Sequence, residues 1–162
     1  MSVVLARVDN RLIHGQVLEA WVPHTRADYI IVVDDEVAND PFRKLLMSSV
    51  VPKTLQVDIY SHAQLKSIMS GDKMDNARVL VLFATPANAL RAYQDGLLFS
   101  VLNLGNMHVG SQKCCISRTL YMDNADIEDL EQLSRLGVDI SAQCIPTDRA
   151  LQWDCNCSEL GS

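Results

Sequence analysis

Residues 9–16 bring together side chains that suit phosphoryl chemistry. His14 carries an imidazole, which is a competent nucleophile near neutral pH. Arg11 has a forked guanidinium that can hold two phosphate oxygens at once. Gly15 lets the backbone approach a ligand without a Cβ. The types and spacing of these residues indicate a site for a phosphoryl group.

The same segment has less specific interpretations. A histidine after a strand often caps a helix or is simply solvated, and Arg11 could form a surface ion pair with Asp9 that contributes little. In the phosphoryl interpretation, Asp9 orients Arg11 or the imidazole, and the backbone N–H groups around Gly15 and Gln16 receive the phosphate charge at a helix start.

The elements that would position this segment alternate along the chain. Strands are predicted near residues 3–8, 29–33, 55–60, 79–83, 100–104 and 138–142, and helices near 15–23, 39–50, 61–70, 86–95 and 124–136. Ser61 with Gln64 matches a capping box, and Pro86 suits a first helical turn. This alternation predicts a single α/β domain over residues 1–162, with a mostly parallel central sheet and helices on both faces. Ligands bind such sheets beyond the carboxyl ends of the strands, where residues 9–16 would lie.

The composition argues against several classes of function. The chain has 162 residues, and its net charge of -6 argues against nucleic acid as a partner. Its apolar runs are shorter than the roughly 20 residues that span a bilayer. The N-terminus reads as a strand and not as a signal peptide, so we expect a cytoplasmic protein with free thiols.

Beyond these patterns, the sequence resembles a known family. The run RVDNRLIHGQV at residues 7–17, with Trp21 after it, resembles the active-site segment of the IIB components of the bacterial phosphotransferase system, mannose/fructose/sorbose type. The similarity continues in IVVDDEVAND (31–40) with Arg43 and Lys44, in LFATP (82–86) and in LNLGNM (102–107), and more weakly at residues 137–138 and 146–148. It covers most of residues 3–149 in order.

The resemblance implies a protein-Nπ-phosphohistidine–sugar phosphotransferase subunit. His14 would be the transient phosphohistidine, phosphorylated on Nδ1, and would need neither a cofactor nor a metal. The donor would be a phosphorylated IIA protein or domain. The acceptor would be a sugar handled by the membrane components IIC and IID, through which the chain would associate peripherally with the inner membrane. The sequence does not identify the sugar, and it leaves a homodimer open.

Other residues receive weaker assignments. Thr85 could donate its hydroxyl to the phosphate or cap the helix before Pro86. The loop 105–108 could wall the site, although His108 is not expected to be catalytic. The acidic residues 34–36 could suggest Mg²⁺, but a solvated loop or a partner contact is favoured. His24 and His62 look like surface or helix-end residues.

The cysteines and the C-terminal segment carry no predicted function. Their spacings do not match those of structural zinc sites, and their roles stay open: Cys114, Cys115, Cys144, Cys155 and Cys157. Residues 151–162 are expected to form a flexible tail that departs from the family.

Two functions other than sugar transport remain open for this sequence. A regulatory phosphocarrier would use the same His14 to control a partner protein without transporting sugar. A non-enzymatic α/β module would bind a small anion through Arg11 and backbone amides, and would form no covalent adduct at His14.

Overall fold

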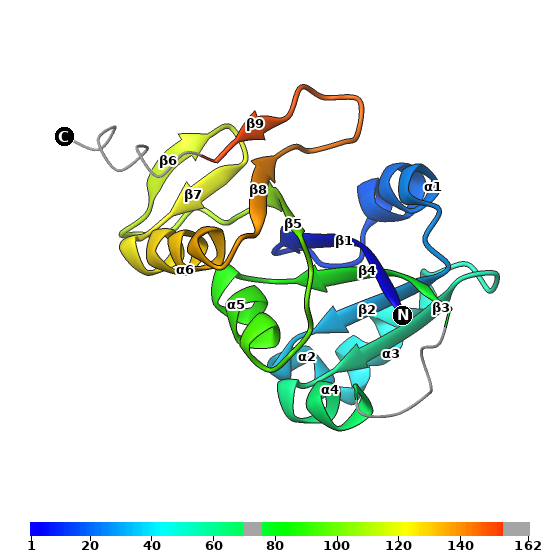
Figure 1. Ribbon diagram of the computed structural model, residues 1–162. Coiled ribbons are helices and arrows are strands. Elements are labelled where there is room, and N and C mark those ends of the chain that lie inside the picture. The colour runs from blue at the N-terminus through cyan, green and yellow to red at the C-terminus, as the bar shows by residue number, and fades with distance from the viewer. Residues whose placement is uncertain (70–75, 154–162) are drawn as a thin grey trace.

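The first strand of the chain lies at the centre of the sheet. The computed structural model describes residues 1–69 and 76–153. Its main sheet contains β1 (Ser2–Asp9), β2 (Tyr29–Val33), β3 (Gln56–Tyr60), β4 (Arg78–Phe83), β5 (Val101–Asn106), β8 (Asp139–Ala142) and β9 (Leu151–Gln152). Within the described residues these seven strands follow the order β3-β2-β4-β1-β5-β8-β9 (Figure 1). All neighbouring pairs are parallel except β8 and β9.

Helices cover both faces of this sheet, as the sequence predicts. One face packs against α4 (His62–Ile68), α5 (Pro86–Gln94) and α6 (Asn124–Arg135), through buried residues such as Leu65, Leu90 and Leu130. The other face packs against η1 (Val17–Trp21), which continues into α1 (Val22–Thr25), and against α2 (Asp35–Ala38) and α3 (Pro41–Ser49). The two apolar clusters follow the alternation of side chains along each strand.

Local sequence signals place most helix starts correctly. Ser61 and Gln64 form the predicted capping box, in which the Ser61 side chain accepts from the Gln64 N–H and the Gln64 side chain accepts from the Ser61 N–H. Pro86 occupies the first turn of α5, after the cap Thr85. Asp123 caps α6 in a second capping box, and Gly137 follows that helix with φ +95°.

The structure differs from the prediction in three places. The helix expected over 39–50 is α3, but a further short helix that was not predicted, α2, precedes it; Asp34 caps α2 and Asp40 caps α3. Residues 107–122, for which no element was predicted, contain an antiparallel hairpin of β6 (Cys114–Ser117) and β7 (Leu120–Met122). Residues 151–152, expected to begin a flexible tail, are instead paired with β8 as β9, and the remainder of that segment, 154–162, lies outside the described residues. Strands this short show little alternation in the sequence.

The connections around β1 create a crevice at one edge of the sheet. After β1 the chain enters η1 and α1 on one face of the sheet. After β4 it enters α5 on the opposite face, and after β5 and the β6–β7 hairpin it enters α6 on that same opposite face. A crevice opens at such a reversal, beyond the carboxyl ends of the strands. The loop that follows β1 therefore lies at the expected position for a site. Among the helices of the described residues, none is long and apolar enough to cross a membrane.

The capping box of α4 yields a stability prediction. We expect Ser61→Ala to lower the free energy of unfolding by about 1 kcal/mol, because the Gln64 N–H loses its acceptor at the helix start. Urea denaturation followed by circular dichroism measures the change. The matched control is Ser49→Ala, since the Ser49 hydroxyl only donates to the Leu46 carbonyl at the end of α3; this variant should stay within about 0.5 kcal/mol of wild type. Equal losses in the two variants would contradict the capping role.

Candidate functional site

The loop after β1 turns sharply and buries a leucine. Leu12 donates its N–H to the Asp9 carbonyl at 2.9 Å and adopts the left-handed region with φ +57°. This conformation is uncommon for a residue with a Cβ. Leu12 is buried in the apolar cluster beneath η1, so packing offsets the backbone cost. The turn returns the chain to the sheet and presents His14 above the end of β1.

His14 lies immediately before a helix whose middle part is wound as a π-helix. Helical backbone begins at Gly15 and extends to Thr25, with Val17–Trp21 wound as the π-helix η1. The Leu18 N–H donates to the His14 carbonyl at 3.1 Å, which ties His14 to the first turn. The N-terminal end of a helix carries partial positive charge and unpaired N–H groups, so it favours an anion.

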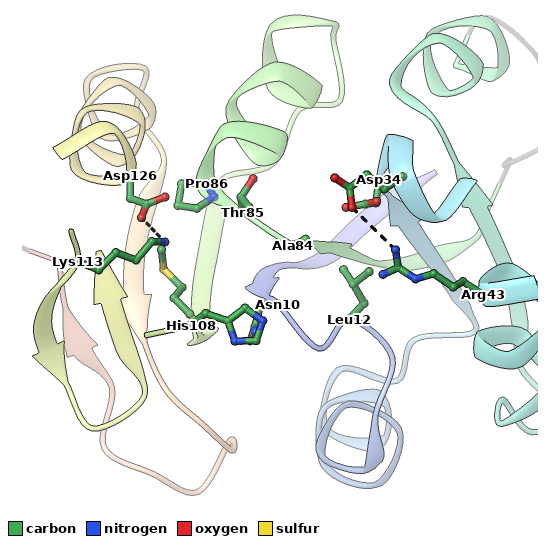
Figure 2. Close-up of a pocket in the computed structure, with 12 residues that line it drawn as sticks. Asn10, Leu12, Asp34, Arg43, Ala84, Thr85, Pro86, His108, Lys113 and Asp126 are labelled. Atoms are coloured by element: carbon green, nitrogen blue, oxygen red, sulfur yellow. Dashed lines mark hydrogen bonds and ion pairs between the residues drawn. The ribbon is translucent and has the colours of Figure 1, made fainter. Parts of the chain in front are cut away.

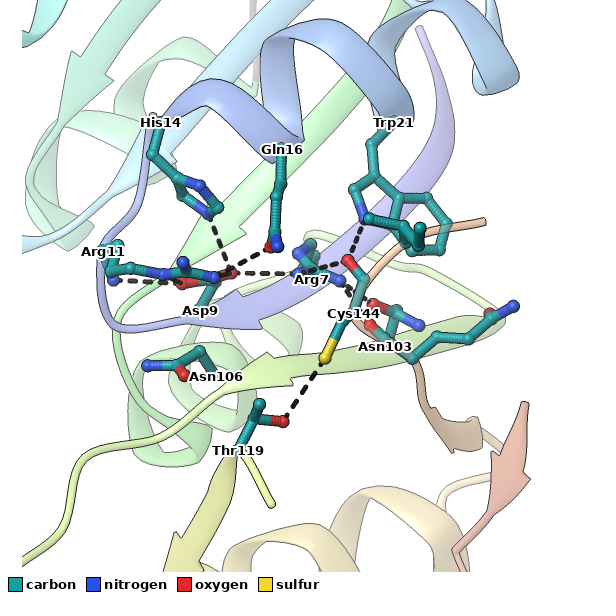
Figure 3. Close-up of polar contacts among 12 residues, drawn as sticks. Arg7, Asp9, Arg11, His14, Gln16, Trp21, Asn103, Asn106, Thr119 and Cys144 are labelled. Carbon is teal, nitrogen blue, oxygen red and sulfur yellow. Dashed lines mark hydrogen bonds and ion pairs between the residues drawn. The ribbon is translucent and has the colours of Figure 1, made fainter. Parts of the chain in front are cut away.

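Asp9 is the centre of the polar contacts at this site (Figure 3). Its carboxylate is fully buried and accepts from Arg7 Nη2 at 3.0 Å and from His14 Nε2 at 3.0 Å. Arg11 donates to it three times: from its backbone N–H at 3.1 Å, from Nε at 3.1 Å and from Nη2 at 3.2 Å. The sequence left open whether Asp9 orients Arg11 or the imidazole, and the structure shows contacts with both.

These donors keep Asp9 ionised although it is buried. Burial by itself would raise the pKa of the Asp9 carboxyl. The hydrogen bonds from His14 and Arg11, together with the charge of Arg7, outweigh that effect and hold the pKa well below its usual range. Asp9 is therefore an anion over the whole physiological pH range.

The contact with Asp9 distinguishes the two nitrogens of His14. Nε2 faces the carboxylate, which fixes the proton on that nitrogen in the neutral ring. No described residue forms a hydrogen bond to Nδ1, and the side chain is 17% exposed. The arrangement offers the Nδ1 lone pair to an incoming group.

Arg11, Gly15 and Gln16, for which the sequence predicted roles at the site, belong to the same loop and helix start as His14. The Arg11 side chain is 43% exposed and donates to Gln16 Oε1 at 3.0 Å as well as to Asp9. Gly15 is exposed, and a Cβ built on it would meet no atom within 4 Å. The protein's own packing therefore does not require glycine there, and the open space faces whatever approaches from outside.

Arg7 is a site residue that the sequence reasoning missed. It is fully buried, and it donates to the Asn103 side chain, to the Gln143 carbonyl at 2.9 Å and to the Cys144 carbonyl at 3.2 Å, besides Asp9. Its guanidinium lies 5.0 Å from the centre of the Trp21 ring. The available signal was an arginine inside an apolar strand, between Ala6 and Val8 and two residues before an aspartate.

Two neighbours accommodate this buried arginine. A Cβ on Gly105 would collide with the Arg7 guanidinium, so β5 must carry a glycine where it passes that group. The Trp21 Nε1–H donates to the same Cys144 carbonyl at 3.0 Å, which holds the segment after β8 against the guanidinium. Burial lowers the pKa of Arg7, and the charge of Asp9 opposes that effect.

Thr85 is not brought into contact with His14. Its hydroxyl accepts from the Asn88 N–H at 3.2 Å, which is the helix-capping role that the sequence offered as an alternative. Thr85 lines a neighbouring cavity of about 210 Å³ at the carboxyl ends of the strands, also bordered by Asn10, Leu12, His108 and others (Figure 2). On one side of this cavity, Arg43 of α3 forms an ion pair with Glu36. On the other side, Lys113 forms an ion pair with Asp126.

The acidic residues 34–36 are used mainly for local structure. Asp34 is buried and accepts from the Val37 N–H at 2.9 Å. Asp35 accepts hydrogen bonds from the His62 N–H and from Arg91. The bond from the His62 N–H is the main reason that the pKa of Asp35 lies below its ordinary value. Among the residues that the structure describes, no group of three or more His, Cys, Asp or Glu could hold a metal ion.

The other histidines and the cysteines lie apart from His14. Of the two positions expected for His62, surface or helix end, the structure shows the helix end: it is the first residue of α4 and only 1% exposed. It is buried because α4 packs this end against α5, where Asn88 lies 3.4 Å from its Nε2. Cys114 and Cys115 are exposed free thiols, and Cys144 is a half-buried one. Cys155 and Cys157 lie outside the described residues.

Fold and site together define an open, mostly parallel α/β protein with a histidine held at the switch point of its sheet. The family described as "PTS system sorbose subfamily IIB component" matches residues 3–159. The chain belongs to this family.

Individual relatives agree with that membership. The chain is 34% identical over 148 residues to the sorbose-specific EIIB component of Lacticaseibacillus casei, covering 91% of this chain and 90% of that protein. It is 33% identical over 152 residues to the mannose-specific EIIAB component of Escherichia coli K12, covering 94% of this chain but 47% of the relative. The chain thus spans about half the length of the EIIAB relatives that it matches.

Solved structures show the same fold. The IIBSor domain of the sorbose permease from Klebsiella pneumoniae superposes with a TM-score of 0.92 at 27% identity, covering 100% of this chain and 99% of that one. The N-acetylgalactosamine-specific IIB component 1 from Escherichia coli gives a TM-score of 0.86 at 29% identity, covering 94% and 100%.

The state of Asp9 predicts how stability depends on pH. Because the pKa of Asp9 is lowered on folding, its contribution to stability is complete above about pH 5, where an unfolded aspartate is also ionised, and is lost as pH falls further. We expect the melting temperature of wild type to drop more steeply between about pH 5 and pH 2 than that of Asp9→Asn.

Thermal melts across that pH range measure the difference. Asp123→Asn is the control, since it changes an aspartate at the start of α6, outside the Asp9 group. Parallel curves for wild type and Asp9→Asn would contradict an ionised Asp9 as a source of stability.

Proposed function

We propose that the chain is the IIB phosphoryl carrier of a sugar phosphotransferase system. It accepts a phosphoryl group on His14 from a phosphohistidine of a IIA protein or domain. It then passes the group to a sugar handled by IIC and IID membrane components, so its place is the cytoplasm, at the inner membrane through those partners. The observation that carries this proposal is the hydrogen bond from His14 Nε2 to buried Asp9, which leaves Nδ1 as the nucleophile.

The transfer step follows from this geometry. The Nδ1 lone pair attacks phosphorus in line with the donor nitrogen; the new N–P bond forms as the donor's N–P bond breaks, and that electron pair returns to the donor imidazole. The phosphorylated His14 ring keeps its proton on Nε2 and so carries positive charge. Asp9 lies 3.0 Å from that nitrogen and stabilises the charge as it develops.

Arg11 supplies positive charge on the exposed side of the site. Its side chain is bonded to Asp9 and Gln16 but is only partly buried, so it can turn its guanidinium to the phosphoryl oxygens. The helix start at Gly15 adds backbone N–H groups, and the open space beside Gly15 leaves room for the oxygens and for the donor protein.

A phosphorylation assay tests the role of His14. Purified protein is mixed with phosphoenolpyruvate, the general phosphotransferase proteins and a IIA donor, and its intact mass is measured. We expect one acid-labile, alkali-stable phosphate on wild type and none on His14→Ala. His24→Ala is the control, because His24 lies at the end of α1 and should not affect labelling. A folded wild type that stays unlabelled with several IIA donors would contradict the carrier role.

The proposed contact of Arg11 with the phosphoryl group gives a second test. Arg11→Ala should slow phosphoryl transfer by about 10- to 100-fold, the effect of losing a charge-assisted hydrogen bond of about 1.5–3 kcal/mol. Rapid-quench labelling measures the rate. Arg91→Ala is the matched control, since Arg91 also pairs with a carboxylate, Asp35, but lies on α5 away from His14. An unchanged rate in Arg11→Ala would remove Arg11 from the site.

A further inference from the structure

Arg7 cannot reach the reacting group itself. Its side chain has no exposed surface, and the residues around it come from four separate parts of the chain: Asp9 on β1, Asn103 on β5, Trp21 in η1 and the carbonyls of residues 143–144. A phosphoryl donor or sugar approaching His14 would therefore not touch the guanidinium. Any influence of Arg7 on the reaction must pass through Asp9.

The position of Arg7 suits it to fix the Asp9 carboxylate. One of its terminal nitrogens, Nη2, donates to Asp9 Oδ2, the same oxygen that faces His14 Nε2. The other, Nη1, donates to Asn103 and to the Gln143 carbonyl. Because the guanidinium is planar and held at both ends, it sets where Oδ2 lies and thereby which nitrogen of His14 meets a carboxylate.

The second arginine on Asp9 cannot do this throughout the reaction. Arg11 is 43% exposed, and in the proposed function it turns toward the phosphoryl oxygens. Among the described residues, Arg7 is then the one arginine whose side chain is still bonded to Asp9. A buried carboxylate without a fixed cation would be costly. The Arg11 backbone N–H still holds Asp9 Oδ1, so Arg7 is the constant partner of Oδ2, the oxygen that faces His14.

We propose that Arg7 is a positioning residue that determines which nitrogen of His14 accepts the phosphoryl group, by locking the Asp9 carboxylate against Nε2. The inference rests on the proposed function for the phosphoryl step, but the state of the imidazole before any transfer follows from the same contacts. In the wild type the proton is on Nε2 and the phosphoryl group goes to Nδ1. Without Arg7 the carboxylate loses its fixed orientation, and the ring is no longer held in one tautomer.

Two substitutions separate the geometry of Arg7 from its charge. Arg7→Lys keeps a positive charge but lacks the planar fork, so it cannot hold Asp9 and Asn103 together. Arg7→Met removes the charge as well as the fork, leaving Asp9 with less compensation. Both variants should mix the two tautomers and slow transfer by about tenfold or more.

The first measurement is nitrogen-15 NMR of the His14 ring in the unphosphorylated protein. We expect a single tautomer with the proton on Nε2 in wild type and a mixture in both Arg7 variants. The second measurement locates the phosphoryl group by phosphorus–nitrogen correlation after labelling. We expect Nδ1 alone in wild type and a detectable Nε2 fraction in the variants. A merely structural role would lower the melting temperature without changing the nitrogen that is labelled.

Matched variants keep the test decisive. Arg78→Lys is the control, because Arg78 also donates to two backbone carbonyls but sits at the opposite end of β4, and it should match wild type in every readout. If the Arg7 variants do not fold, Asn103→Leu is tested in their place, since it removes one of the two acceptors of Arg7 Nη1 and so loosens the guanidinium while leaving the charges of Arg7 and Asp9 in place. It should give a smaller loss of nitrogen selectivity.

The outcomes distinguish this inference from the proposed function. The positioning role would be overturned if the folded Arg7 variants, or Asn103→Leu in their place, keep three properties of wild type. These are the tautomer, the labelled nitrogen and a rate within twofold. A wild type that accepts no phosphoryl group would overturn the proposed function. In that case the tautomer measurement still tests Arg7, because it needs no phosphate.

Discussion

The Asp9 carboxylate is fully buried and ionised, and the neighbouring structure satisfies that charge. Removing a carboxylate from water costs several kcal/mol unless charges and hydrogen bonds replace the solvent. Here Arg7, Arg11 and His14 supply those bonds. The turn at Leu12 brings Arg11 and His14 back over the strand end, so the loop conformation and the charge balance support each other.

The central position of β1 makes this arrangement possible. A strand with neighbours on both sides can bury a charged side chain beneath the site, whereas an edge strand would leave it in contact with water. Gly105 on the neighbouring β5 leaves space for the Arg7 guanidinium, and Trp21 covers its face. The helix that starts at Gly15 thus has two roles: its first turn presents His14, and its π-wound middle provides the aromatic ring that covers the buried arginine.

Most of the other acidic groups near this edge of the sheet serve the fold. Asp34, Asp40 and Asp123 each accept N–H groups at a helix start, and Asp35 ties α2 to α4 and α5. Such caps satisfy backbone groups that would otherwise remain unpaired. Asp9 differs from them because its partners are charged or titratable side chains and because it sits beneath His14, the proposed nucleophile. Its position at the end of β1 separates this carboxylate, which contacts the proposed phosphoryl acceptor, from several carboxylates that only cap helices.

The sequence by itself determined the alternating strands and helices, the two capping signals at Ser61 and Pro86, and the loop in which His14 lies. These features are local: hydrophobic periodicity and turn chemistry act over a few residues, and a histidine between a strand and a helix can be recognised without knowing what packs against it. The run at residues 7–17 also carried the family resemblance. The β6–β7 hairpin and β9 were not predicted, because strands of two to four residues depend on their neighbours and not on their own pattern.

Only the tertiary structure decided how the site is built. Arg7 meets Asn103, Trp21 and residues 143–144 across 14 to 137 positions of chain, so no local pattern indicates that these groups share one guanidinium. The same is true of His62, which the packing of α4 on α5 buries, whereas the Thr85 cap is a local contact that the sequence had offered as an alternative. Sequence spacing places chemical groups at one edge of a sheet, whereas their distances and charges depend on contacts between distant segments, which form only when the chain is folded.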